Sequence, residues 1–151
     1  MYLELPFYAQ EQNERCYKMI ELVNPAGMKP MGAYSQAIKI DLGMNKSLIL
    51  VAGQIAVDAD GKAAAPNDIE TQTRIVFDNI NTVLKEAGAT LNDVVKAQIF
   101  LTDMAQYAKV SLIRNEYFAQ NRPVSTLVEI SRTVIDGCDI EIEVMAITEH
   151  N

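Results

Sequence analysis

Consecutive apolar residues within predicted strands limit the folds open to this chain more than any other sequence feature. They occur at residues 49–51, 99–101, 127–128 and 144–147. Because successive side chains of a strand point to opposite faces of its sheet, such runs predict a sheet with two apolar faces. Each face must then be covered by another part of the chain or by another molecule.

A first helix is predicted to follow Asn67. Asn67 and Glu70 have the spacing of a capping box, and Gly88 is expected to end the helix. The apolar residues between them recur at helical spacing and form one face: Ile69, Val76, Phe77, Ile80, Val83, Leu84 and Ala87. This face can cover one side of the sheet.

A second helix is predicted over residues 105–120, with Ala108, Leu112 and Phe118 in its apolar stripe. After an optional first strand, the order of elements is ββαβαββ. This order indicates an α+β domain with one mixed sheet covered on one face by two helices. The strands are predicted at residues 18–24, 34–41, 47–57, 93–103, 122–130 and 139–147.

Two helices cannot cover both faces of the sheet. The economical cover for the second apolar face is the same sheet of another copy, so we expect a closed homo-oligomer. Clefts between its subunits would be natural sites for a small-molecule ligand.

The composition argues against several classes of function. A net charge of −7 without any Lys/Arg-rich run disfavours nucleic acid as a partner, because the phosphate backbone is also negative. Cys16 and Cys138 are far apart and His150 is the only histidine, so no metal site, disulfide framework or cofactor is predicted. The apolar runs are too short to span a bilayer and no signal peptide is recognisable. We expect a cytoplasmic protein without a membrane partner, with an organelle as the alternative.

Residues 1–18 differ from the rest of the chain. They are rich in aromatic residues but sustain neither the strand nor the helix period, so we interpret them as an N-terminal extension. An ordered arm that packs on a neighbour is the alternative. The single domain is then residues 19–151.

Glu141 and Glu143 are a carboxylate pair in the last predicted strand. Because they are two residues apart, they point to one face, while the apolar residues between and beyond them point to the other. They either form a solvated strand face or, at a cleft, orient or deprotonate a water molecule. Periodicity alone does not choose between these alternatives.

Tyr34 and Gly53 each have a structural and a functional interpretation. Tyr34 is predicted to begin a strand, where a tyrosine packs more often than it catalyses. A glycine inside a strand, such as Gly53, marks a bulge or the close approach of a ligand or another backbone. Ser125 and Thr126 have no histidine near them in the sequence, which argues against a serine-hydrolase triad.

Seven segments together resemble one family: PMGAYSQAIKI, SLILVAGQIAVD, VLKEAG at a helix end, DVVKAQIFLTDM, NEYF in the second helix, RPVSTLVEI and IEIEVMAI. In order and spacing they are similar to the YjgF/Rid family, also labelled endoribonuclease L-PSP, over residues 19–148. The resemblance implies a chorismate-mutase-like fold and a homotrimer whose sheets form a central barrel. It also implies ligand clefts between the subunits.

Active members of this family hydrolyse reactive enamines and imines, such as 2-aminoacrylate, to a keto acid and ammonia. The resemblance implies that Tyr34, Gly53 and Glu141 match site residues of the family, with Glu141 and Tyr34 as the catalytic pair. The arginine that clamps the substrate carboxylate stands two residues after the proline of RPVSTLVEI, and here that position is Ser125. Because bidentate arginine is well suited to a carboxylate, its absence predicts poor use of 2-aminoacrylate.

Three other positions depart from the family pattern. Ala52 stands where serine is common, Leu127 where cysteine is frequent, and Ser111 where an asparagine begins the motif of the second helix. Arg122 or Arg132 could reach the cleft from its rim. We expect the cleft to persist with a changed charge preference, and its substrate-binding candidates are Gly53, Ser111, Arg122, Ser125, Thr126 and Leu127.

These observations leave two main hypotheses. The first is a trimeric hydrolytic deaminase of an imine-like metabolite, with Glu141 positioning water. The second is a non-catalytic trimer that binds a small metabolite or a protein through the same clefts. A ribonuclease is a third reading, which follows only from the family's second label and is opposed by the acidic composition and the lack of a His or Lys constellation.

Overall fold

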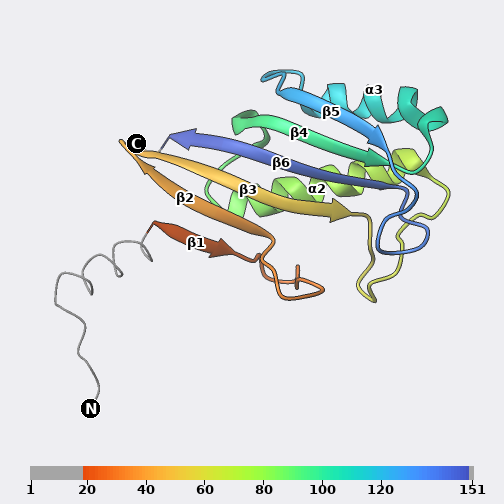
Figure 1. Ribbon diagram of the computed structural model, residues 1–151, viewed down its shortest axis with the longest axis horizontal. Coiled ribbons are helices and arrows are strands. Elements are labelled where there is room, and N and C mark those ends of the chain that lie inside the picture. The colour runs from red at the N-terminus through yellow and green to blue at the C-terminus, as the bar shows by residue number, and fades with distance from the viewer. Residues whose placement is uncertain (1–18, 150–151) are drawn as a thin grey trace, which may run out of the picture.

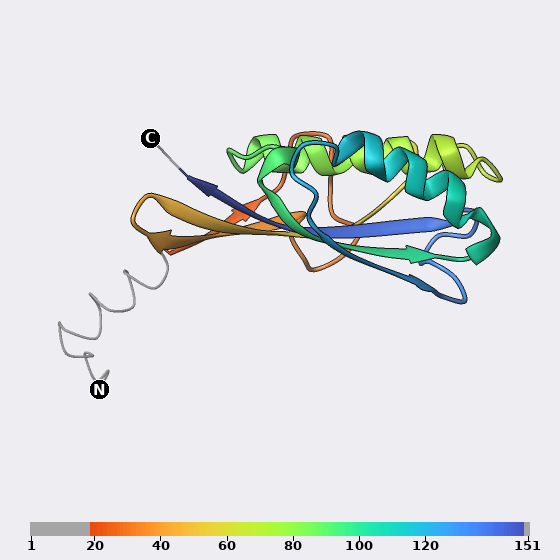
Figure 2. The same ribbon diagram turned by 90° about the horizontal axis from the view of Figure 1, so that it is seen from above.

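The computed structural model describes residues 19–149, which form one six-stranded sheet with two α-helices on one of its faces (Figures 1 and 2). The strand order is β1-β2-β3-β6-β4-β5, and every neighbouring pair is antiparallel except the parallel pair β4 and β5. The predicted α+β class, mixed sheet and element order are confirmed. The elements are β1 (Ile20–Val23), β2 (Ala37–Gly43), β3 (Lys46–Ile55), α2 (Ile69–Glu86), β4 (Val94–Leu101), α3 (Tyr107–Tyr117), β5 (Val124–Glu129) and β6 (Ile140–Glu149).

The predicted N-terminal extension, residues 1–18, lies outside the described residues, as does His150. Within residues 19–149, neither α2 nor α3 has the length and hydropathy that a membrane-spanning helix needs.

Helix α2 begins one residue later than the sequence predicted. Asp68 is its N-cap, because Asp68 Oδ1 accepts the backbone N–H of Thr71 at 3.1 Å and Asp68 Oδ2 accepts the Thr71 hydroxyl at 2.7 Å. Asn67 lies before the cap with a φ of 64°. The predicted capping box of Asn67 and Glu70 is therefore wrong: the aspartate at the next position satisfies the free amide of the first turn.

The end of α2 follows the prediction. Gly88 has a φ of 80°, which glycine adopts without the steric cost of a Cβ. Its N–H donates to the Lys85 carbonyl at 3.0 Å, and the Ala89 N–H donates to the Leu84 carbonyl at 2.8 Å. These two bonds form a Schellman motif, which satisfies carbonyls that the helix end leaves free.

The core lies between α2 and the covered face of the sheet. Every residue of the apolar face predicted for α2 is buried, and Phe77 and Ile80 are completely buried. From the sheet, the core receives alternate residues of β3, β4 and β6: Ile49, Val51, Ala97, Ile99, Leu101, Ile140, Ile142, Val144 and Ala146. Truncating one of the large side chains, such as Phe77, to alanine would cost about 3–5 kcal/mol of stability.

Helix α3 differs from its prediction. Ala108 and Leu112 are exposed, and the buried residues near them are Val110 and Ile113; only Phe118 of the predicted stripe is buried. The short amphipathic pattern fits more than one face, and packing against α2 selects the face observed.

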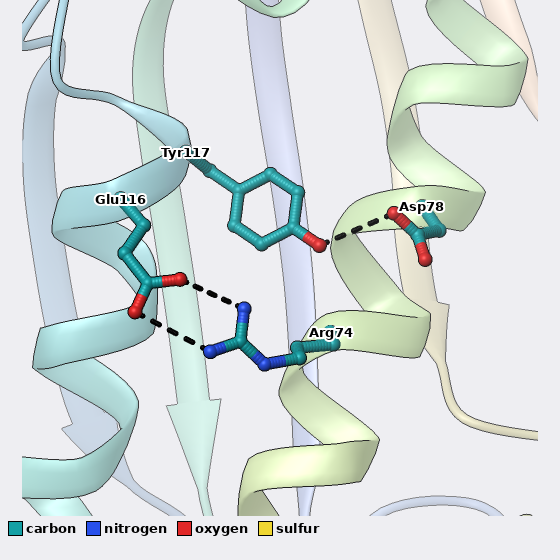
Figure 3. A network of polar contacts seen from close by, with 4 residues as sticks. All are labelled: Arg74, Asp78, Glu116 and Tyr117. Atoms are coloured by element: carbon teal, nitrogen blue, oxygen red, sulfur yellow. Dashed lines mark hydrogen bonds and ion pairs between the residues drawn. The ribbon is translucent and has the colours of Figure 1, made fainter.

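Polar contacts join α3 to α2 at the outer surface (Figure 3). The Arg74 guanidinium donates to both carboxylate oxygens of Glu116, at 2.8 and 3.3 Å, and the Tyr117 hydroxyl donates to Asp78 Oδ1 at 3.2 Å. The Tyr117 ring stacks on Phe77 with 4.5 Å between the ring centroids. These contacts position α3 over the sheet and leave its Leu112 side pointing outward.

The other face of the sheet carries no helix (Figure 2). One half of this open face is apolar, and the predicted second apolar face is confirmed there for β3 and the end of β6. On the side of β4 and β5 the face also carries polar residues, among them Lys96, Gln98 and Thr126, so the prediction is confirmed only in part. Two rows of paired residues cross the apolar half: Ile20, Ile40, Leu48 and Ile147 in one, and Leu22, Ile38, Leu50 and Met145 in the next. Leu22 is 66% exposed and Ile147 42% exposed, so this surface is uncovered in the single chain.

Candidate active site

A β-bulge in β3 brings Gly53 against Glu141 of the neighbouring strand β6. The ladder pairs Val51 with Val144 and then Gln54 with Ile142, so two residues of β3, Ala52 and Gly53, oppose one residue of β6. A Cβ built on Gly53 would overlap Glu141 Oε1 and would lie 2.9 Å from Glu141 Cδ. The Glu141 carboxylate therefore occupies the space that only a glycine leaves at this bulge. Gly53 was predicted to mark a bulge or a close approach. It lies at a β-bulge, and the group that approaches it is the Glu141 side chain.

The surroundings of Glu141 change its acidity. Glu141 and Glu143 point to the open face, because Ile140, Ile142 and Val144 are buried on the covered face. The pKa of Glu141 is raised from its ordinary value, mainly because burial disfavours the carboxylate and secondly because of the charge of Glu143. The predicted alternation of β6 is confirmed. Glu141 is a partly buried carboxyl group that holds its proton more strongly than an exposed glutamate does.

Gly53 also lines a pocket of about 350 Å³ between the loop before β2 and the loop after β3. Tyr34 lies in the same pocket, so the structure brings these two predicted residues together. The other lining residues include Met28, Lys29, Met31, Gln36, Gln54, Ile55, Asp58 and Asn79. The pocket sits at the end of the sheet where β3 leaves the bulge.

Tyr34 is not in a strand, contrary to the prediction. Strand β2 begins at Ala37, and the Tyr34 N–H donates to the Gly32 carbonyl at 2.9 Å within a turn. The Tyr34 hydroxyl accepts the backbone N–H of Met31 at 3.2 Å, and the residue is 46% exposed. The glycine and proline content of this segment favours the turn over an extended strand. Tyr34 thus closes its own loop beside the pocket.

Two glutamines of the site were not recognised from the sequence. Gln54 Nε2 donates to Gln36 Oε1 at 2.8 Å, and Gln36 Nε2 donates to the Met28 carbonyl at 3.1 Å. Both glutamines are buried, with exposures of 8% for Gln36 and 5% for Gln54. Buried amides are rare unless they are hydrogen-bonded. The sequence signal was a glutamine directly after Gly53 in an otherwise apolar strand.

Strand β5 places its candidate residues on two different faces. Thr126 pairs with Gln98, which pairs with Glu143, so Thr126 lies on the open face in the same row as that carboxylate. Ser125 and Leu127 alternate with Thr126 and belong to the opposite face. Ser125 is exposed at this edge of the sheet, and no β5 residue lines the pocket of Tyr34 and Gly53.

The remaining predicted residues lie away from that pocket. Ser111 is on α3, where its hydroxyl accepts a hydrogen bond from Arg114 Nη2 at 2.9 Å. Arg122 is exposed in the turn before β5, with a φ of 45°. Arg132 lines a separate pocket of about 470 Å³ with Lys62, Thr133 and Asp136. Within the single chain, Gly53 and Tyr34 line one pocket, and Glu141 contacts Gly53 without lining that pocket itself. The other predicted residues lie outside the pocket: Ser111, Arg122, Ser125, Thr126, Leu127 and Arg132.

Among residues 19–149, no group of three His, Cys, Asp or Glu side chains is placed to hold a metal ion. The chemistry available at the site in this part of the chain is that of two carboxyl groups, Glu141 and Asp58, together with a phenol, amides and one lysine.

Known proteins are similar to most of this chain. The family model described as endoribonuclease L-PSP matches residues 25–148. A RutC family protein of Pyrococcus abyssi is 43% identical over 121 residues, which cover 80% of this chain and 91% of that protein.

Solved structures resemble the fold over nearly its whole length. YyfA of Yersinia pestis, described as a member of the conserved Rid protein family, superposes with a TM-score of 0.72 at 35% identity, covering 84% of this chain and 98% of its own. The crystal structure of E. coli TdcF with bound serine superposes with a TM-score of 0.70 at 25% identity, covering 85% of this chain and 99% of its own.

Proposed function

The chain belongs to the endoribonuclease L-PSP family, which includes the RutC and Rid proteins, and on that premise we propose that it hydrolyses a small imine or enamine to a carbonyl product and ammonia. The observation that carries this proposal is the Glu141 carboxyl group against Gly53, at a bulge beside a pocket. A carboxyl group whose pKa is raised by burial accepts a proton from a water molecule more readily than an ordinary carboxylate does, and it can donate that proton afterwards.

The proposed reaction needs one proton-transfer group and a water molecule. The substrate enters as its protonated imine, and Glu141 accepts a proton from water as the water oxygen bonds to the imine carbon, which gives a neutral carbinolamine. Glu141 then returns this proton to the amine nitrogen. The carbon–nitrogen bond breaks as the hydroxyl group loses its proton to Glu141, so that the carbonyl forms and ammonia leaves, and ammonia takes up the proton from Glu141. Tyr34 and Gly53 shape the pocket, and the Tyr34 hydroxyl is a polar group available at its edge.

We further propose that the working unit is a homotrimer with a cleft between neighbouring subunits. The uncovered apolar half of the open face supports association, because an exposed apolar surface of this extent is normally covered. In a trimer, residues of β5 could complete the site of a neighbouring subunit, although they lie away from the pocket of their own chain. We place the protein in the cytoplasm, without a membrane partner.

The identity at position 125 means that a carboxylate substrate such as 2-aminoacrylate would need a cation from another position of the chain. Ser125 has a hydroxyl group where the family resemblance predicts a carboxylate-clamping arginine. Hydrogen bonds to charged groups contribute about 1.5–3 kcal/mol, so losing such a clamp weakens carboxylate binding about tenfold or more. The same serine favours the alternative function, a trimer that binds a small metabolite or a protein without catalysis.

Ammonia release tests the proposal. The protein is mixed with a panel of imines generated enzymatically, 2-aminoacrylate among them, and ammonia is measured against Glu141→Gln. We expect acceleration by the native protein and none by the variant. If no imine is hydrolysed faster, the deaminase proposal fails and the binding trimer takes its place. RNA cleavage that survives removal of contaminating nuclease and responds to salt would instead support the activity in the family's label.

A further inference from the structure

Lys29 is the cationic residue of the pocket that holds Tyr34 and Gly53. Among the described residues that line this pocket, the charged side chains are Lys29 and Asp58. Arg132 lines the adjoining pocket, which shares only Gly61 with this one, and Arg122 lines neither. Neither of the arginines predicted from the sequence to reach the cleft lines the pocket at Gly53 within one chain, whereas Lys29 does.

The loop that carries Lys29 is fixed on both sides of the residue. On one side, the Met28 carbonyl accepts Gln36 Nε2 at 3.1 Å, and Gln36 Oε1 accepts Gln54 Nε2 at 2.8 Å. On the other side, the Met31 N–H donates to the Tyr34 hydroxyl at 3.2 Å. The buried glutamine pair thus ties the backbone beside Lys29 to the residue that follows Gly53.

Lys29 also lacks a competing partner. Within residues 19–149 its ammonium group makes no ion pair or hydrogen bond, unlike Lys46, which pairs with Glu149 at 2.9 Å. The acidic residue of the pocket, Asp58, forms no ion pair with Lys29, and its Oδ1 accepts the backbone N–H groups of Asp60 at 2.9 Å and Lys62 at 3.0 Å. An exposed ammonium on a fixed loop is free to meet an anionic ligand.

We propose that Lys29 binds the carboxylate of the ligand in this pocket, in place of an arginine at position 125. The inference rests on the proposed function in one respect only, that the pocket is the ligand site. An ammonium is a compact point charge without the rigid fork of a guanidinium, so it favours an anion without selecting a bidentate geometry. The ligand class is a small 2-oxo or 2-imino carboxylate, whose reacting carbon then lies toward Gly53, the residue that Glu141 contacts.

Binding of two matched probes tests this role. Pyruvate and pyruvamide have similar shapes and differ in charge, and their dissociation constants can be measured by titration calorimetry or NMR. We expect the native protein to bind pyruvate at least tenfold more tightly than pyruvamide. Lys29→Gln should abolish this preference, and Lys29→Arg should retain most of it.

Lys85→Gln is the matched control, because Lys85 is an exposed lysine in the last turn of α2 and does not line the pocket. It should keep the full preference for pyruvate. Thermal unfolding of each variant confirms that the fold is intact, as expected for substitutions of exposed side chains. The proposal is overturned if the native protein does not prefer pyruvate, or if the preference survives Lys29→Gln. If the preference is lost in Arg132→Gln and kept in Lys29→Gln, the role belongs to Arg132.

These outcomes separate the role of Lys29 from the deaminase activity. If Lys29→Gln removes the pyruvate preference while the native protein releases no ammonia, Lys29 binds the carboxylate of a non-catalytic site. If ammonia is released and Lys29→Gln leaves the preference unchanged, the activity stands and the role of Lys29 is rejected.

Discussion

Glu141 lies against the backbone of Gly53, in the space that a side chain at position 53 would fill. The two residues are far apart in the sequence, and the bulge in β3 brings them together by placing two residues opposite one of β6. Close packing on the bulge also contributes to the burial that raises the pKa of Glu141. The bulge therefore affects both the position of the Glu141 carboxyl group and its pKa.

Gly53→Ala should displace the Glu141 carboxylate without unfolding the protein. The new methyl group would meet the far end of a flexible side chain, which can rotate away, and Gly53 has no positive φ that alanine would strain. We expect ammonia release to fall at least tenfold, because about 1 Å of misplacement of a reacting group can cost that much or more.

Gly32→Ala is the matched control for this substitution. There an added Cβ would lie 3.6 Å from the Tyr34 ring, which is ordinary van der Waals contact. Circular dichroism and ammonia assays compare the two variants. Equal activities of Gly53→Ala and Gly32→Ala would contradict the role of the Gly53–Glu141 contact.

Glu141→Gln should remove turnover and change the pH dependence of stability. A raised carboxyl pKa means that the folded protein holds this proton to higher pH than the unfolded chain does. The stability linked to Glu141 is thus present below its ordinary pKa of 4.5 and is lost as pH rises through the raised pKa. The glutamine variant lacks this loss, so its melting temperature relative to the native protein should rise across that pH range. A difference that is constant with pH would argue against a raised pKa.

Glu143→Gln should shift the acidic limb of the pH–rate profile to lower pH. The charge of Glu143 is the second cause, after burial, of the raised pKa of Glu141, so its removal brings part of that increase down. If Glu141 must be deprotonated to accept a proton from water, the rate then persists to lower pH. Initial rates measured from acid to neutral pH check the direction. A shift to higher pH would show that the two carboxylates are not coupled in this sense.

Ser125→Arg should improve the use of 2-aminoacrylate. A bidentate arginine adds about 1.5–3 kcal/mol of charge-assisted hydrogen bonding, which corresponds to a KM lower by about tenfold or more. The Ser125 side chain is exposed at the sheet edge, so the longer side chain does not disturb the core. The assay follows ammonia at varied substrate concentration, with Ser125→Gln as the uncharged control. An unchanged KM would place residue 125 outside the ligand cleft.

Leu50→Glu should weaken the oligomer. Leu50 lies on the open face between Ile38 of β2 and Met145 of β6, in the middle of the apolar half. A charge there must be desolvated when a second sheet covers this face. We expect a shift from trimer to monomer by light scattering coupled to size exclusion. Leu112→Glu is the control, because Leu112 is 68% exposed on α3, and its variant should keep the native mass. The same mass for both variants would refute packing through the open face.

Predictions that rest on long periodic segments were accurate. The apolar face of α2 and the alternation of β6 recur over many residues, so a single arrangement satisfies them, and Ile80 and Ile142 are completely buried as that arrangement requires. The end of α2 at Gly88 was also predicted correctly, because a glycine readily adopts the positive φ that ends a helix. The N-cap was wrongly assigned to Asn67 because Asn67 and Asp68 both fit a cap. The wrong face of α3 was predicted because its short pattern fits more than one face.

The sequence by itself determined the order of strands and helices, the apolar residues on both faces of β3 and β6, and the position of Glu141 on the face of β6 opposite its buried apolar residues. These follow from the strand and helix periods, which are properties of the local backbone. Only the tertiary structure decided that Glu141 meets Gly53, that Gln36 bonds to Gln54, and that Lys29 enters the pocket while Ser125 stays outside it. Such contacts depend on strand register, on a bulge and on a folded loop, which bring together residues that no local period relates.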